Sequence, residues 1–209
     1  MKQTFLSVQT KKLVPNFTDE NFGSLLVQLF AGQDLPFLLI ESVEFKQLLE
    51  FLRPGTRIFK ADWLRIKVLQ QYQSLKAQVI GAFSAIDFKL SFTTDIWTAP
   101  NDIAFMSITA HWIDINFEMN NVLMDFIELH GSHSGVNIEN VFSNSLITYK
   151  VFDKKLAVTL DNASNNNAFI AALMERDPTF DREHHIRCFG HVLNLTAQDA
   201  LRTMSDEIN

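Results

Sequence analysis

Apolar residues recur at every third or fourth position through most of the N-terminal part of the chain. That spacing places them on one face of an α-helix and predicts three amphipathic helices. The predicted helices span residues 19–30, 42–52 and 60–83, and the turn-forming pair Pro54-Gly55 separates the last two. Residues 1–18 are polar and mixed, so we expect a tail followed by a helical region over residues 19–84.

After Phe88 apolar residues recur at every second position, which indicates β-strands with one buried face. Three strands are predicted first, and helices and single strands then alternate. The strands are expected over residues 89–94, 103–112, 122–128, 155–160 and 184–187, and the helices over residues 136–149, 162–174 and 189–202. An antiparallel meander followed by alternating helices and strands is the order of an RNase H-like fold. We therefore predict a mixed α/β sheet flanked by helices over residues 85–209, preceded by an all-α N-terminal region.

Composition fits a globular protein, because 47% of the 209 residues are hydrophobic and 20% are charged. No apolar run approaches the roughly 18 residues that suggest a membrane span, so no membrane partner is expected. A single cysteine cannot form an internal disulfide and favours a reducing intracellular compartment. Residues 1–90 hold 11 Lys and Arg against 8 Asp and Glu, whereas residues 91–209 hold 7 against 16. The acidic second part is therefore a poor electrostatic match for nucleic acid on its own.

Two aspartates stand at comparable places in the predicted sheet. Asp95 follows the strand over residues 89–94, and Asp161 follows the strand over residues 155–160. An RNase H-like fold puts these two strands side by side, so both carboxylates are expected at one edge of the sheet. Such a pair suits a divalent-metal site for phosphoryl transfer. The alternative is that each aspartate caps a turn or a helix start by accepting backbone N–H groups.

Histidines and the single cysteine gather near the C-terminal end. Cys188 and His191 form a Cys-x-x-His pair on one predicted helix face, and His184 and His185 precede them. This density invites a zinc site. The favoured interpretation is that Cys188 is a small buried apolar residue and His191 a hydrogen-bonded structural support, so zinc is not the expected cofactor.

Other polar and aromatic residues allow two interpretations each. Trp97 and Trp112 are suited to stacking on bases or to packing in a core, and core packing is favoured. For two further sets, a turn-forming role is favoured over a chemical one. These sets are His130, His133 and Asp114, and Asn162, Asn165 and Asn166.

Five segments, in order, resemble the catalytic core of hAT-superfamily transposases. They are Thr93-Thr94-Asp95-Ile96-Trp97-Thr98, then His111-Trp112-Ile113-Asp114, then residues 130–138, then Thr159-Leu160-Asp161-Asn162 with the residues to Asn166, and finally Arg187-Cys188-Phe189-Gly190-His191 with the residues to Leu195. Leu35-Pro36-Phe37 resembles the helical segment that precedes this core. The similarity covers residues 35–201.

The resemblance implies a nuclear protein with DNA as its partner and DNA strand cleavage and transfer as its chemistry. Asp95 and Asp161 match the first two members of the family's Asp-Asp-Glu triad, which binds two divalent ions, Mg²⁺ or Mn²⁺. Cys188 and His191 match the Cys-x-x-His motif beside that site and are expected to support it structurally. Homo- or hetero-oligomers with related transposases are also implied.

The chain departs from the family pattern at the third acidic residue of the Asp-Asp-Glu triad. Asp206 and Glu207 stand at the chain end on no evident scaffold, and no BED-type zinc finger or dimerisation segment is recognised. We therefore expect a truncated protein of transposable-element origin with a partial core that is catalytically incomplete and binds Mg²⁺ or Mn²⁺ weakly or vestigially. One alternative is a domesticated nuclear module that binds chromatin partners. The other is a metal-dependent DNA nuclease that uses Asp206 or Glu207 as its third acid.

Overall fold

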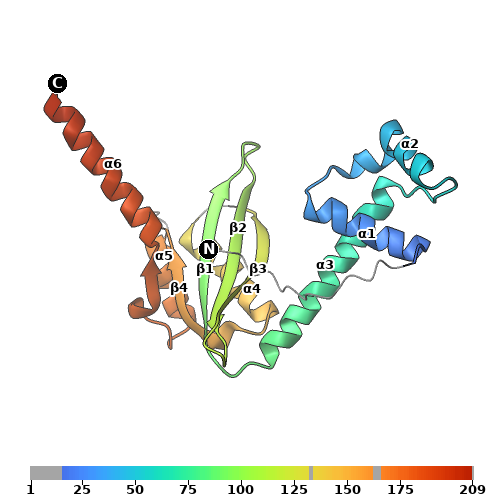
Figure 1. The fold of residues 1–209 in the computed structure, drawn as a ribbon. Helices are drawn as coiled ribbons and strands as arrows, with labels where there is room; N and C mark the ends of the chain where they lie inside the picture. Colours follow the sequence, from blue (N-terminus) through green and yellow to red (C-terminus); the bar gives the residue numbers. More distant parts are fainter. Residues whose placement is uncertain (1–15, 132–133, 162–165, 209) are drawn as a thin grey trace. The chain divides into compact units, whose positions relative to one another are not determined.

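The computed structural model describes residues 16–131, 134–161 and 166–208, with side chains through residue 203 (Figure 1). Most of the predicted tail, and the predictions for His133, Asn162 and Asn165, therefore lie outside the described residues. The chain divides into two units, residues 1–78 and 79–209, and each has its own hydrophobic core. No helix in the described ranges is long and apolar enough to cross a membrane.

Helices build the first unit, as predicted. They are α1 (Asp19–Gly32), the short 3-10 helix η1 (Phe37–Glu41), α2 (Val43–Leu52) and the N-terminal part of α3 (Ala61–Ser84). Hydroxyl groups cap two of these helices, because Thr18 Oγ1 accepts from the Asn21 N–H at 3.0 Å and Ser42 Oγ from the Phe45 N–H at 3.2 Å. The apolar faces meet in one core, formed by Leu26, Val27, Phe30, Ile40, Phe59, Ala61 and Leu64.

A five-stranded mixed sheet organises the second unit. Its strands are β1 (Leu90–Thr98), β2 (Ala104–Ile113), β3 (Met119–Leu129), β4 (Lys155–Leu160) and β5 (His185–Arg187), in the spatial order β3-β2-β1-β4-β5. The first three strands are antiparallel, whereas β4 is parallel to β1 and β5 is parallel to β4. The helices are α4 (Gly135–Thr148), α5 (Asn166–Arg176) and α6 (Phe189–Ile208). The mixed α/β prediction is confirmed, and the arrangement is consistent with an RNase H-like fold.

The two faces of the sheet differ sharply in burial. Leu90 and Phe92 on β1 point to a covered face, where they meet apolar residues of α4 and α5. On this face the Phe142 ring stands edge-on to Phe92 at 6.1 Å and to Phe169 at 5.4 Å. The opposite face, which carries Thr93, Asp95 and Trp97 on β1, is half-buried or exposed. We call it the open face.

Two elements are longer than the sequence pattern predicts. Strand β1 continues to Thr98 rather than ending at residue 94, because residues through Thr98 pair with β2 as far as Ala104. Strand β3 begins at Met119 rather than at residue 122, because Met119 to Asn121 pair with β2. The turn itself is tighter and forms around Asp114, whose Oδ1 accepts from the Asn116 and Glu118 amides at 2.8 and 3.0 Å. The predicted turn role of Asp114 is confirmed.

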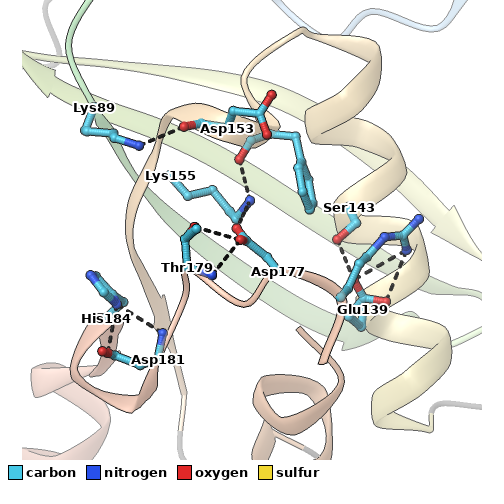
Figure 2. A network of polar contacts seen from close by, with 11 residues as sticks. Lys89, Glu139, Ser143, Asp153, Lys155, Asp177, Thr179, Asp181 and His184 are labelled. Atoms are coloured by element: carbon cyan, nitrogen blue, oxygen red, sulfur yellow. Dashed lines mark hydrogen bonds and ion pairs between the residues drawn. The ribbon is translucent and has the colours of Figure 1, made fainter. Parts of the chain in front are cut away.

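Two buried ionic contacts tie the helices to the sheet (Figure 2). Lys155 Nζ lies 3.0 Å from Asp177 Oδ2, with only 1% and 13% of the two side chains exposed. The same ammonium donates to the Phe152 carbonyl and lies 3.2 Å from the centre of the Phe152 ring. Nearby, the buried Glu139 carboxylate of α4 accepts from Ser143 Oγ at 2.5 Å and pairs with Arg176 of α5 at 3.3 Å. These contacts fix the start of β4 and the α4–α5 pair.

Replacing Asp177 with Asn should destabilise the protein by about 3–5 kcal/mol, because it leaves the Lys155 ammonium buried without a counter-charge. Asn retains an oxygen for Thr179, whose N–H and Oγ1 both donate to Asp177 Oδ1. Urea unfolding measures the loss. The matched control is Asp181→Asn at the exposed N-cap of the 3-10 helix Arg182–His184, where Asn caps about as well as Asp, so stability should stay within about 0.5 kcal/mol of wild type. Equal stability of the two variants would contradict a stabilising role for the pair.

The Lys155–Asp177 ion pair also makes the stability of the folded protein depend on pH. Burial by itself would raise the pKa of Asp177, but hydrogen bonds from Thr179 and Lys155 outweigh it and hold that pKa below the ordinary value of 3.8. The folded state thus binds the proton less readily than the unfolded chain, so this contribution is present above pH 3.8 and is lost as pH falls through the lower folded pKa. Unfolding titrations should show a steeper acid loss in wild type than in Asp177→Asn.

A further prediction concerns the contact between α4 and α5. A Cβ at Gly135 would lie 2.4 Å from the Phe169 backbone nitrogen, so no side chain fits there. Gly135→Ala should cost about 1–3 kcal/mol, the usual penalty of overpacking. Gly81→Ala in α3 is the control, because nothing lies within 4 Å of its added methyl group. There alanine should stabilise by up to about 1 kcal/mol through helix propensity. Thermal unfolding of both variants checks the opposite signs.

Candidate functional site

Three parallel strands bring the predicted site residues to one row. Thr93 on β1 pairs with Thr159 on β4, and Thr159 pairs with Ile186 on β5. Asp95, Asp161 and Cys188 each stand two residues beyond these partners. Neighbouring strands lie about 4.8 Å apart, so the three positions are adjacent in the sheet, at the carboxyl ends of β4 and β5. The expectation that the fold places Asp95 beside Asp161 agrees with this register.

The two aspartates have different surroundings. Asp95 lies inside β1 opposite Ser107 and is exposed on the open face, so it caps no helix or turn. Asp161 is half-buried directly after β4. Asn166, at the start of α5, donates its side-chain amide to the Asp161 carbonyl at 2.7 Å and to Asp161 Oδ1 at 2.6 Å. This contact confirms the turn-shaping role predicted for Asn166 and orients the carboxylate.

Cys188 joins the end of the sheet to α6. Its N–H donates to the Leu160 carbonyl at 2.8 Å, which extends the β4–β5 ladder by one step. Its carbonyl then accepts from the Val192 N–H at 3.1 Å and begins the helix. Cys188 and His191 are both half-buried, whereas the residues around them on α6 are exposed. Cys188 therefore occupies the junction between β5 and α6, and His191 lies on the first turn of α6.

The other histidines of the predicted cluster lie apart from this row. His184 Nδ1 accepts from the Asp181 N–H at 3.1 Å and closes a capping box at the short helix before β5. His185 Nε2 is buried and has no hydrogen-bond partner among the described residues. Burial, with a smaller effect of Arg187, lowers the pKa of His185. The structure thus gives His184 a capping role that its Asp181 neighbour could have signalled.

The carboxylate pair suits a hard cation but supplies only part of a coordination shell. Carboxylate oxygens are preferred ligands of Mg²⁺ and Mn²⁺, and Asp95 is open to solvent. Within the described residues, no group of three or more His, Cys, Asp or Glu is close enough to hold a metal ion. Magnesium demands a nearly octahedral shell, so two carboxylates leave several positions to water or phosphate.

The length of α6 indicates whether Asp206 or Glu207 can serve as the third acidic residue of the site. The helix runs without a break from Phe189 to Ile208. At a rise of 1.5 Å per residue, its backbone carries residue 206 about 26 Å from Phe189. That separation is far longer than an aspartate or glutamate side chain. The helix therefore does not favour the nuclease alternative that assigns Asp206 or Glu207 to the site.

The two tryptophans lie on opposite faces of the sheet. Trp112 packs against the covered core, edge-on to Phe83 at 5.8 Å, as expected. For Trp97 the core-packing prediction is wrong, because 40% of the residue is exposed and it lies on the open face with Asp95. Strict alternation along β1, which places Trp97 two positions after Asp95, was the signal in the sequence. A Thr93 Oγ1 to His111 Nε2 contact of 3.0 Å on that face was not predicted.

Comparison with known proteins agrees with this geometry. Residues 93–190 match the family model of the ZBED1 RNase-like domain, a range that contains Asp95, Asp161 and Cys188. A Zea mays protein named "Putative AC transposase" is 27% identical over 182 residues, which is 84% of this chain and 23% of the relative. Zinc finger BED domain-containing protein RICESLEEPER 1 of Oryza sativa is 24% identical over 196 residues, 90% of this chain and 27% of the relative.

A human relative extends the comparison. Zinc finger BED domain-containing protein 4 of Homo sapiens is 22% identical over 195 residues, 86% of this chain and 16% of the relative. The chain thus spans no more than about a quarter of the length of these relatives. Together with the mixed sheet, these matches show that the chain is similar to hAT-type transposases and that its residues 93–190 are similar to an RNase-like domain.

Proposed function

We propose that this transposase-derived protein associates with DNA and that Asp95 and Asp161 together bind a divalent cation, Mg²⁺ or Mn²⁺. The observation that supports the proposal is the strand register. Thr93 and Thr159 are paired across β1 and β4, so the two aspartates that follow them by two residues are neighbours. As part of this proposal the centre is incomplete for phosphoryl transfer, which is supported by the lack, within the described residues, of a group of three or more His, Cys, Asp or Glu that could hold a metal ion.

The residues of the row have distinct parts in this proposal. Asp95 is exposed and would hold the ion where a phosphate can reach it, while Asn166 holds the Asp161 carboxylate in place. A bound divalent ion would supply Lewis-acid stabilisation of phosphate charge. Cys188 and His191 act as structural supports, because the Cys188 amide fixes the β5–α6 junction against Leu160. Zinc has no part in the proposal.

Charge explains why DNA association would need the cation. Residues 91–209 hold 16 Asp and Glu against 7 Lys and Arg, so phosphate is repelled unless the carboxylates are neutralised. The relatives support DNA as the partner, since one is named a transposase and two are named for BED zinc fingers. Nuclear localisation and association with related transposases are part of the same proposal.

A second candidate function rests on α6. Several of its apolar side chains are largely exposed, with Phe189 at 74%, Leu193 at 52% and Leu201 at 67%. Exposed apolar residues along one amphipathic helix are typical of a protein interaction surface. This observation favours the domesticated-module alternative, in which the protein binds nuclear protein partners instead of processing DNA.

The metal site is tested by titrating the protein with Mn²⁺ and measuring bound ion by calorimetry. Wild type should bind with a dissociation constant of about 10⁻³ M, because the ligand set is small. Asp95→Asn and Asp161→Asn should each abolish detectable binding. Asp102→Asn is the matched control: it makes the same charge change in the β1–β2 turn, where φ is +61°, a conformation that Asn tolerates.

Two outcomes would contradict the proposal. Undiminished Mn²⁺ binding by Asp95→Asn and Asp161→Asn would place the cation elsewhere. Nicking of a supercoiled plasmid in Mg²⁺ by wild type, lost in Asp95→Asn, would show that the catalytic site is complete.

A further inference from the structure

Strand β3 lies at one end of the sheet, and among the described residues β2 is its only strand neighbour. The outer side of an edge strand carries backbone N–H and C=O groups that can pair with another strand. Proteins usually protect such edges with charged side chains, above all lysine, with proline or with a β-bulge. Strand β3 is eleven residues long and contains no Lys, Arg or Pro.

Only the second half of this edge is protected. The β2–β3 register shifts by one residue at Met124, which forms a β-bulge. The Phe126 N–H donates to the carboxylate of its own neighbour, Asp125, at 3.2 Å, so it is already occupied. The first half, residues 119–123, has neither feature and is a regular strand about 17 Å long. An added strand would therefore pair with residues 119–123.

The tip of the β2–β3 hairpin holds an aromatic residue in a strained conformation. Phe117 has a φ of +60°, in the left-handed region that glycine adopts easily and that makes a bulky residue an outlier. The residue is nevertheless 90% exposed. Asp114 fixes the turn, because its carbonyl accepts from the Phe117 N–H and its own N–H donates to the Glu118 carbonyl, both at 3.0 Å. Backbone strain of this kind concentrates at functional positions, which points to a recognition role for the exposed ring.

Charge indicates what this surface binds. Residues 104–129 contain four acidic residues, Asp114, Glu118, Asp125 and Glu128, and no Lys or Arg. Glu118 directly precedes the unpaired segment and Asp125 follows it by two residues, so acids stand at both of its ends. DNA would be repelled here, and so would the same hairpin of a second copy. A basic polypeptide complements this charge.

We propose that the first half of β3 binds an extended peptide that carries a basic residue near each end and adds to the five-stranded sheet as a further strand. Backbone hydrogen bonds to residues 119–123 supply the affinity, as in other complexes formed by strand addition. Lysine or arginine side chains of the peptide pair with Glu118 and Asp125. Apolar side chains between them contact the exposed Phe117 and Leu123. This interaction goes beyond the proposed cation site and does not depend on it.

The probe is a fluorescein-labelled peptide of about eight residues, the span from Glu118 to Asp125, with lysine at both ends and alternating valine and threonine between them. Fluorescence anisotropy should show saturable binding to the full chain at low ionic strength, and the affinity should fall as salt is added. Hydrogen exchange of the amides in residues 119–123 should slow in the complex. The same peptide N-methylated at every central residue cannot donate hydrogen bonds to β3 and should not bind.

Replacing Phe117 with glycine separates recognition from a structural role. The change relieves the strained φ and removes the exposed ring. The midpoint of thermal unfolding should therefore rise, while binding of the probe should weaken at least about fivefold. A residue with only a structural role would not produce opposite changes in stability and affinity.

A charge exchange tests the acidic end of the segment. Glu118→Lys should weaken binding of the probe at least about threefold, and a probe with glutamate in place of lysine should bind this variant better than it binds wild type. Glu175→Lys is the matched control for net charge. It makes the same change at an exposed position in the last turn of α5 and should bind the probe as wild type does.

Several results would overturn the proposal. Absence of saturable binding by wild type, or equal affinity of the N-methylated probe, would exclude strand addition. Unchanged affinity in both Phe117→Gly and Glu118→Lys would exclude this surface. A wild-type dimer in light scattering that dissociates in Phe117→Gly would show that a second copy covers the edge instead. Mn²⁺ binding should be equal in Phe117→Gly and wild type, so the cation site and the peptide site are tested separately.

Discussion

The pairing of β1 with β4 is the constraint on which the rest of the site depends. Strand β1 is antiparallel to β2 on one side and parallel to β4 on the other, so it lies at the centre of the sheet. A slip of one residue in this parallel register would turn every side chain of β4 to the opposite face. Asp161 would then leave the face that carries Asp95, and the row of site residues would no longer exist.

Packing on the covered face keeps this register in place. Gly135 lets α4 approach α5 so closely that a methyl group would collide with the Phe169 backbone. The Lys155–Asp177 ion pair fixes the first residue of β4 against the turn that follows α5. The same strands therefore carry the site residues on the open face and the packed apolar residues on the covered face, because alternate residues of a strand point to opposite faces.

Periodicity predicted the elements well because most of them have one buried face. The helices of the first unit and the five strands appear close to the ranges that their apolar spacing predicts. The alignment of Asp95 with Asp161 was expected from their places after two predicted strands, although β1 continues past Asp95 to Thr98. Strand extensions were missed because the last residues of β1 and the first of β3 are held by pairing with β2, while Asp95 in β1 and Asn120 and Asn121 in β3 do not signal a strand. The exposed position of Trp97 was missed because a tryptophan is usually assigned to the core by its size. The contact of Asn166 with Asp161 was anticipated as a turn interaction, since asparagine commonly bonds to nearby backbone groups.

The junction between the sheet and α6 has a mechanical consequence. One main-chain hydrogen bond, from Cys188 to Leu160, joins the base of a helix of 20 residues to the strand that precedes Asp161. A helix of that length extends about 30 Å, so a force applied at its far end would act with a long lever arm on the junction between β4 and α6, next to Asp161.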